Sequence, residues 1–179
     1  MYLGQKEYLD VLGAYDWLLE EKSYPSSSIG ILGISTGALT TALAFGESEI
    51  QAMWLDSAII DFPLLVENEL ERLGYPKMLA SPAIAMGERI IGINPNEVPP
   101  MTAASKAGER PMYLAHGEDD GRISPLHSQM FYDRALASDA NVTLWMIEDS
   151  GHVDAVWENP EYQGRLVSFF TDALAWNSS

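Results

Sequence analysis

The chain alternates between segments with helical spacing of apolar residues and short runs that are apolar throughout. Apolar residues recur on one face between Tyr8 and Leu19, a spacing that predicts an amphipathic helix. Residues 29–34 read Ile-Gly-Ile-Leu-Gly-Ile, as in a strand that is covered on both faces of a parallel sheet. From Thr36, small and apolar residues return to helical spacing. We therefore predict the order helix, strand, helix for this part of the chain.

Later parts of the chain repeat the same alternation. Three further runs predict strands: Ala52–Leu55, Met112–Ala115 and Val142–Ile147. Ser124-Pro125 predicts the start of a helix, and a last amphipathic segment begins near Tyr162. Strands separated by helices form right-handed βαβ units. We predict an α/β fold in which a parallel sheet lies between two layers of helices, as a single domain over residues 1–179.

The stretch from Phe62 to Arg110 differs from the rest because it holds six of the ten prolines among helical fragments. Two interpretations are open. The stretch is either an excursion that forms a partial lid over a site, or ordinary crossover helices with a loop.

Charge and composition exclude or disfavour several classes of function and partner. The chain has 26 acidic and 10 basic residues, a formal net charge of −16 and no cysteine. Disulfides and thiolate chemistry are excluded, and the negative field disfavours nucleic acids as partners. Histidines and carboxylates show no metal-ligand spacing, so we expect neither a metal nor a cofactor. No run is long enough to span a membrane and no signal peptide is visible, which gives a cytoplasmic location by default.

Residues 33–37, Gly-Ile-Ser-Thr-Gly, form a G-x-S-x-G motif between the apolar run and the following helix. This setting is that of a nucleophile elbow, in which a tight, strained turn exposes a serine hydroxyl at the end of a sheet. We expect glycine at Gly33 and Gly37 because side chains there would collide with the strand and the helix. Ser35 is the candidate nucleophile, and the helix N-terminus behind it offers N–H groups to an oxyanion.

A serine nucleophile needs a base to take its proton. His152 follows the strand that ends at Ile147, so it lies at the same edge of the sheet as Ser35. For His116, at the end of a strand, we expect a structural hydrogen-bonding role. For His127, just inside a helix, we expect a surface position. His152 is therefore the candidate base.

The base needs an acid to orient it, and a run of three acidic residues follows another strand. Spacing alone leaves Asp119 and Asp120 both open, and Asp56 is a further candidate at the end of its strand. The order serine, aspartate, histidine is the one that α/β-hydrolases use.

These motifs resemble those of the α/β-hydrolase superfamily, and most of all the compact serine esterases related to dienelactone hydrolases and prolyl-peptidase catalytic domains. The matching segments are residues 33–37, the H-G-x-x-D-x-x-I stretch over residues 116–123, and Gly151-His152. The resemblance implies that Asp120 is the acid and that the N–H of Thr36 is half of the oxyanion hole. It extends from about Tyr8 to Ala175.

One departure from the superfamily concerns the residues before the elbow strand, which predict a single helix. In the superfamily, several strands and the loop that gives the second oxyanion donor normally precede the elbow. The resemblance therefore implies an N-terminally truncated α/β-hydrolase fold. We expect the bare edge of the Ile29–Ile34 strand to be covered by a second copy, as a homo-oligomer, or by a partner segment. The alternative is that the chain is a natural or cloning truncation of a longer enzyme.

The leading hypothesis is a serine hydrolase that cleaves small-molecule carboxylic esters with a small or medium acyl group. A thioesterase or peptidase would use the same residues, because the apparatus specifies acyl transfer and not the donor. A different alternative is a non-catalytic or weakly active binding module. Four residues either line an apolar acyl pocket or belong to the core: Trp54, Met86, Ile90 and Trp157.

Overall fold

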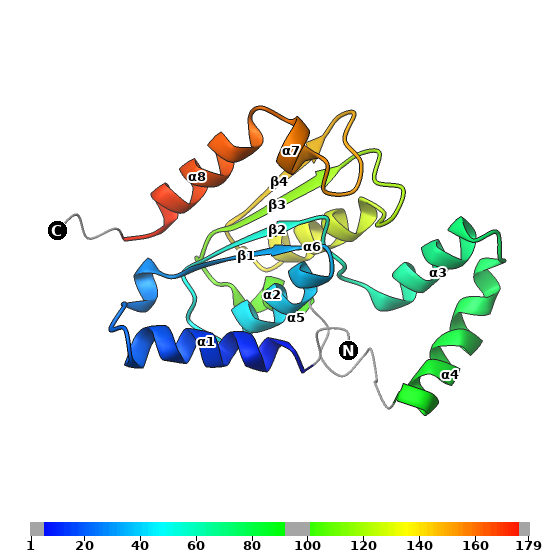
Figure 1. Cartoon of the computed structure of the whole chain (residues 1–179), viewed down its shortest axis with the longest axis horizontal. Helices are drawn as coiled ribbons and strands as arrows, with labels where there is room; N and C mark the ends of the chain where they lie inside the picture. The colour runs from blue at the N-terminus through cyan, green and yellow to red at the C-terminus, as the bar shows by residue number, and fades with distance from the viewer. Residues whose placement is uncertain (1–5, 92–100, 176–179) are drawn as a thin grey trace.

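The computed structural model describes residues 6–91 and 101–175, and its centre is a sheet of four parallel strands (Figure 1). The strands are β1 (Gly30–Ile34), β2 (Ala52–Asp56), β3 (Met112–Gly117) and β4 (Val142–Ile147). Each strand pairs in parallel with the next in sequence, which gives the order β1-β2-β3-β4. The predicted α/β fold with a parallel sheet is confirmed.

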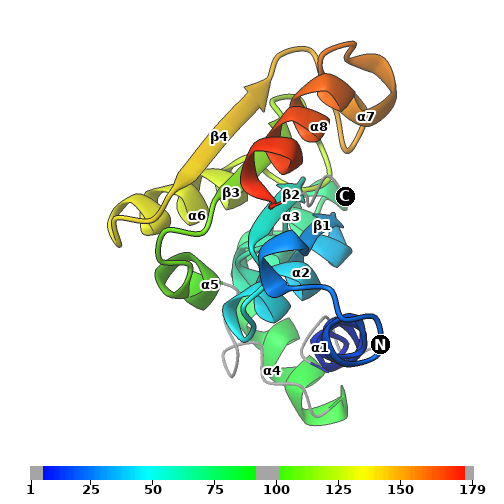
Figure 2. The ribbon, with the colours of Figure 1, turned by 90° about the vertical axis from the view of Figure 1, so that its left-hand side faces the viewer.

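Helices cover both faces of this sheet (Figures 1 and 2). One face carries α1 (Tyr8–Glu20), α2 (Thr36–Gly46), α5 (Met101–Lys106) and α6 (Leu126–Leu136). The opposite face carries α7 (Ala155–Glu158) and α8 (Tyr162–Ala173). Single 3-10 turns lie at Ser26–Ser28 and Lys77–Leu79. The strands therefore end between two helical layers, and their carboxyl ends share one edge.

Alternating side chains of the central strand β2 serve the two layers in turn. Met53 and Leu55 are fully buried in the core beneath α2 and α6. Trp54 points to the opposite face, where its ring stacks on Tyr113 at 4.1 Å between centroids and meets Phe169 of α8 edge-on. Burying both faces of a strand accounts for its continuously apolar sequence.

A second contact ties α8 to the carboxyl end of β2. The Trp54 indole N–H donates to the Tyr162 hydroxyl at 3.1 Å, and that hydroxyl donates to Asp56 Oδ2 at 2.6 Å. Burial and the neighbouring Asp56 charge raise the pKa of Tyr162 far above its usual range. Tyr162 therefore stays a neutral donor that fixes the start of α8 against the sheet.

The segment between β2 and β3 divides into two parts. Helices α3 (Phe62–Arg72) and α4 (Ala80–Ile91) pack on each other and project past the end of the sheet (Figure 1). We call this pair the α3–α4 arm. Helix α5, in contrast, returns to the body and packs against α2 and α6. The stretch from Phe62 to Arg110 thus holds both an excursion and a crossover helix.

Candidate active site

Ser35 occupies the turn between β1 and α2 in a backbone conformation that L residues rarely adopt, with φ 55° and ψ −121°. Its N–H donates to the carbonyl of Asp56 in β2 at 2.9 Å, and its carbonyl accepts from the Ala38 N–H at 3.0 Å. These bonds hold the strained turn in place. Thr36 follows as the first residue of α2 and is exposed.

The two glycines of the motif differ in how much space a side chain would have at each position. A Cβ on Gly33 would come within 2.7 Å of the Cα of Ala38 and would also meet Thr41, so the strand can approach α2 only without a side chain there. A Cβ on Gly37 would meet nothing within 4 Å. The steric expectation is right for Gly33 and wrong for Gly37, which lies on the open side of α2.

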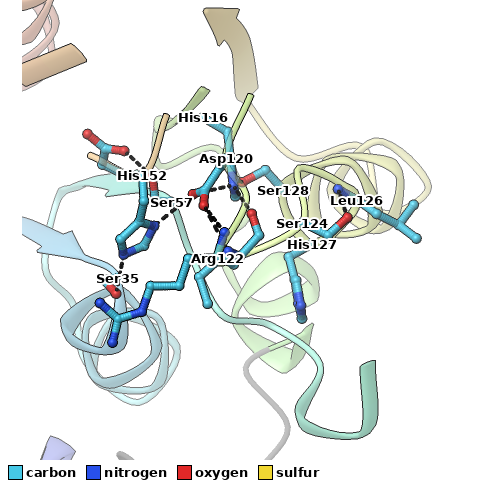
Figure 3. A network of polar contacts seen from close by, with 12 residues as sticks. Ser35, Ser57, His116, Asp120, Arg122, Ser124, Leu126, His127, Ser128 and His152 are labelled. Atoms are coloured by element: carbon cyan, nitrogen blue, oxygen red, sulfur yellow. Dashed lines mark hydrogen bonds and ion pairs between the residues drawn. The ribbon is translucent and has the colours of Figure 1, made fainter. Parts of the chain in front are cut away.

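His152 lies between Ser35 and Asp120 and contacts both (Figure 3). Its Nε2 is 3.0 Å from Ser35 Oγ, and its Nδ1 is 2.7 Å from Asp120 Oδ2. Only 18% of the His152 side chain is exposed, whereas the Asp120 side chain is fully buried. The structure thus brings together the three residues that the sequence singled out, with the imidazole between the hydroxyl and the carboxylate as in a Ser-His-Asp triad.

Close packing of two loops places His152 opposite Asp120. Gly117, at the end of β3, lies so near the histidine loop that a Cβ there would contact the carbonyl oxygens of Ser150 and Gly151. The Asp119 N–H donates to the Ser150 carbonyl at 3.0 Å, and the Glu118 N–H donates to Ile147 at 2.9 Å. The glycine after His116 is therefore needed where the two loops touch.

The carboxylate of Asp120 accepts hydrogen bonds on both oxygens. Oδ1 accepts from the backbone N–H groups of Arg122 at 2.9 Å and Ile123 at 2.8 Å. Oδ2 faces His152, and it also lies 3.3 Å from Nε2 of His116. Burial by itself raises the pKa of Asp120, but these hydrogen bonds outweigh burial and hold that pKa well below its usual range. Asp120 is therefore ionised at neutral pH.

The two other acid candidates are placed elsewhere. Asp119 is exposed. Asp56 is buried and accepts hydrogen bonds from the hydroxyls of Ser57 at 2.9 Å and Tyr162 at 2.6 Å. Burial raises the pKa of Asp56, and the hydroxyl donors oppose that rise. Among the three candidates, Asp120 alone has a hydrogen bond to His152 among the described contacts.

His127 is fully buried, so its expected surface position is wrong. Its Nδ1 accepts the backbone N–H groups of Ile60 and Asp61, each at 3.2 Å, where the chain leaves β2 for α3. Burial lowers the pKa of His127 to about 4. His127 therefore anchors the base of the α3–α4 arm as a neutral imidazole.

Arg122 was not singled out from the sequence; it lies in the loop after β3 over residues 118–125, called the acid loop here. Its side chain points towards the Ser35 side of the site (Figure 3). The acid loop and α3 also line a cleft of about 350 Å³, which includes Asn68, Arg72 and Arg122. Arginine two positions after Asp120 was visible in the sequence, but its direction depends on the loop's conformation.

The four residues offered as an acyl pocket or as core have different surroundings. Trp54 is fully buried under α8, so the core interpretation holds for it. Met86, Ile90 and Trp157 are 61–85% exposed on α4 and α7, so the core interpretation is wrong for these three. Within residues 6–91 and 101–175, no group of three or more His, Cys, Asp or Glu could hold a metal ion. No helix in the same ranges is long and apolar enough to cross a membrane.

A nucleophile elbow at the carboxyl edge of a parallel sheet, with histidine and aspartate on the following loops, defines the α/β-hydrolase class of serine hydrolases. The sequence pattern of the prolyl oligopeptidase family matches residues 1–176. The chain belongs to the prolyl oligopeptidase family. No curated protein sequence matches the chain.

Solved structures with the same fold include an esterase and two peptidases. An esterase of Pyrococcus furiosus is 25% identical, with a TM-score of 0.75 over 97% of this chain and 64% of its own. An acylaminoacyl peptidase of Pyrococcus horikoshii is 21% identical, with a TM-score of 0.72 over 98% of this chain and 29% of its own. Dipeptidyl peptidase 4 of Porphyromonas gingivalis is 16% identical, with a TM-score of 0.74 over 97% of this chain and 24% of its own. The chain thus spans less than two thirds of each of these proteins.

Proposed function

We propose that the protein is a serine hydrolase that cleaves carboxylic esters with a small or medium acyl group. The observation that carries the proposal is the continuous contact from Ser35 Oγ through His152 to Asp120, at 3.0 Å and 2.7 Å. An ester is favoured over a peptide as substrate because the chain covers 64% of the neighbour that is named an esterase, but only 29% and 24% of the two peptidases. The two peptidase neighbours make a peptide the second candidate substrate.

The reaction follows from the positions of the three side chains. Ser35 Oγ attacks the ester carbonyl while its proton passes to His152 Nε2, and the oxyanion that forms is held by the Thr36 N–H at the start of α2. His152 then gives the proton to the departing alkoxide, leaving an acyl-enzyme and a free alcohol. Water then attacks the acyl carbonyl from the same position while its proton passes to His152 Nε2. His152 returns this proton to Ser35 Oγ as the bond to the acyl carbon breaks and the acid leaves. Asp120 keeps Nδ1 protonated and stabilises the imidazolium.

The α3–α4 arm borders this site through the cleft between α3 and the acid loop. We propose that the arm acts as a partial lid, within a single domain, and contacts the part of the substrate beyond the ester. A small-molecule ester would then reach Ser35 from the open side, where Thr36 is exposed.

The test is the intact mass of the wild type and the Ser35→Ala variant after incubation with a fluorophosphonate, which reports an activated serine without knowledge of the substrate. One adduct on the wild type and none on the variant is the expected result. Absence of an adduct on the wild type would instead favour the binding-module alternative. Hydrolysis of p-nitrophenyl esters of increasing chain length, beside acyl-aminoacyl p-nitroanilides, then separates esterase from peptidase.

A further inference from the structure

We propose that His116 is a positioning residue of this site, whose Nε2–H shares the Asp120 carboxylate with His152. The inference rests on the proposed function for its kinetic consequence, but the hydrogen bond itself can be observed without turnover. His116 ends β3, four residues before Asp120, and its side chain is fully buried.

The partners of His116 fix its tautomer. Nε2 faces two acceptors: the Ile123 carbonyl at 2.9 Å and Asp120 Oδ2 at 3.3 Å. It must therefore carry a proton. Nδ1 lies 2.7 Å from the Ser128 hydroxyl, which can donate to it. The neutral Nε2–H form thus satisfies all three contacts, and a buried polar group that is fully bonded in one arrangement is held firmly there.

The donors around Asp120 restrict the orientation of its carboxylate. Two backbone N–H groups occupy Oδ1 of Asp120, and two imidazoles approach Oδ2. Oδ2 therefore cannot rotate away from His152 without losing His116 as well. The His116 donor also draws off part of the carboxylate charge that would otherwise act on His152 alone.

Loss of the His116 donor should change the pH dependence of kcat/KM in one direction. A carboxylate with one donor fewer attracts the His152 imidazolium more strongly, so the acid limb of the pH–kcat/KM profile should move to higher pH by about 0.5 to 1 unit. Misorientation of the acid should lower kcat/KM about tenfold, well below the roughly 10⁴-fold loss known for removing an acid of this kind. Two other titratable groups also act on these histidines. Asp56 interacts electrostatically with both His116 and His152, and His127 interacts with His116.

Two amide variants separate positioning from packing. His116→Gln places an N–H donor near the Nε2 position, whereas His116→Asn places one near Nδ1, out of reach of Asp120. Both leave Asp56 and His127 unchanged. We expect the shifted acid limb and the loss of kcat/KM for His116→Asn, and recovery to within about threefold of wild type for His116→Gln. Phe131→Leu, in the buried core of α6, is the control for lost stability alone and should leave the acid limb in place.

A readout that needs no substrate completes the test. In protein labelled with ¹⁵N-histidine, the His116 Nε2–H signal should be present in the wild type and should change its chemical shift in Asp120→Asn. An unprotonated Nε2, or an unmoved acid limb in His116→Asn with full activity, would overturn the inference. A wild type that takes no fluorophosphonate adduct would refute the proposed function instead, while the histidine NMR spectra would still show whether the hydrogen bond exists.

Discussion

At the scale of single residues, the acid loop shows which parts of the candidate site could be predicted from sequence. Spacing left Asp119 and Asp120 equal, and only the resemblance to a family separated them. The fold separates them physically: Asp119 is exposed, and the Asp120 carboxylate is buried under hydrogen bonds from four residues. Neither the burial of His127 nor the shared contact of His116 could be predicted, because both depend on segments far away or on loop conformation.

The pair Asp119 and Asp120 supplies a matched test of the acid. Asp120→Asn should lower kcat by about 10³ to 10⁴, because an amide cannot hold His152 in the required tautomer. Asp119→Asn, one residue away and exposed, should retain near wild-type activity. Ester hydrolysis under single-turnover conditions measures both. Equal losses in the two variants would mean that the loop as a whole, and not the Asp120 carboxylate, matters.

His127 predicts a pH dependence of stability. Its pKa is about 4 in the folded protein, against about 6.5 when unfolded, so the unfolded state binds the proton first as the pH falls. The stabilising contribution is therefore present above about pH 6.5 and is lost on the way down to pH 4. Between pH 7.5 and 5 the loss should be about 2 kcal/mol.

Urea denaturation of wild type and His127→Asn at the two pH values checks this expectation. Asparagine keeps an acceptor near the Nδ1 position for the Ile60 and Asp61 N–H groups but does not titrate. The variant should therefore lose less stability than wild type over this interval. An identical pH slope in both proteins would show that other groups cause it.

Elements were easier to predict than residues. The four strands are found where apolar runs predicted them. The physical reason is clearest for the central strand β2, which is buried at every position because helices cover both of its faces. The α3–α4 arm was harder to predict, because its two helices pack on each other and project past the sheet (Figure 1). Steric reasoning about the elbow held on the strand side and failed on the helix side, where nothing in the described structure approaches Gly37.

The elbow therefore predicts opposite outcomes for two alanine substitutions. Gly33→Ala forces β1 and α2 apart and should cost about 1 to 3 kcal/mol of unfolding free energy. Gly37→Ala adds a methyl group in open space within a helix and should be neutral or stabilising by up to about 1 kcal/mol. Chemical denaturation of the two variants beside wild type decides the matter. Equal destabilisation would mean that Gly37 is packed in solution.

At the scale of the whole molecule, β1 is one of the two edge strands of the sheet within the described residues, and β4 is the other. Among these strands β1 pairs with β2 alone, and Leu32 in β1 is 40% exposed. The strand Gly-Ile-Leu-Gly-Ile carries neither a charge nor a proline, the usual devices that protect an edge. The edge strand therefore predicts self-association, or capture of a partner segment, through backbone pairing.

The net charge of the chain opposes this association, so association should depend on the salt concentration. Two copies at −16 each repel one another, and salt screens the repulsion while leaving backbone hydrogen bonds in place. The mass from light scattering should therefore exceed that of a monomer, and association should tighten between about 0.05 and 0.5 M salt, where the Debye length falls several-fold. Leu32→Lys places a charge on the edge and should weaken assembly at every salt concentration. A monodisperse wild-type monomer at high salt would rule out pairing between copies, and assembly that is unchanged in Leu32→Lys would place the contact on another surface.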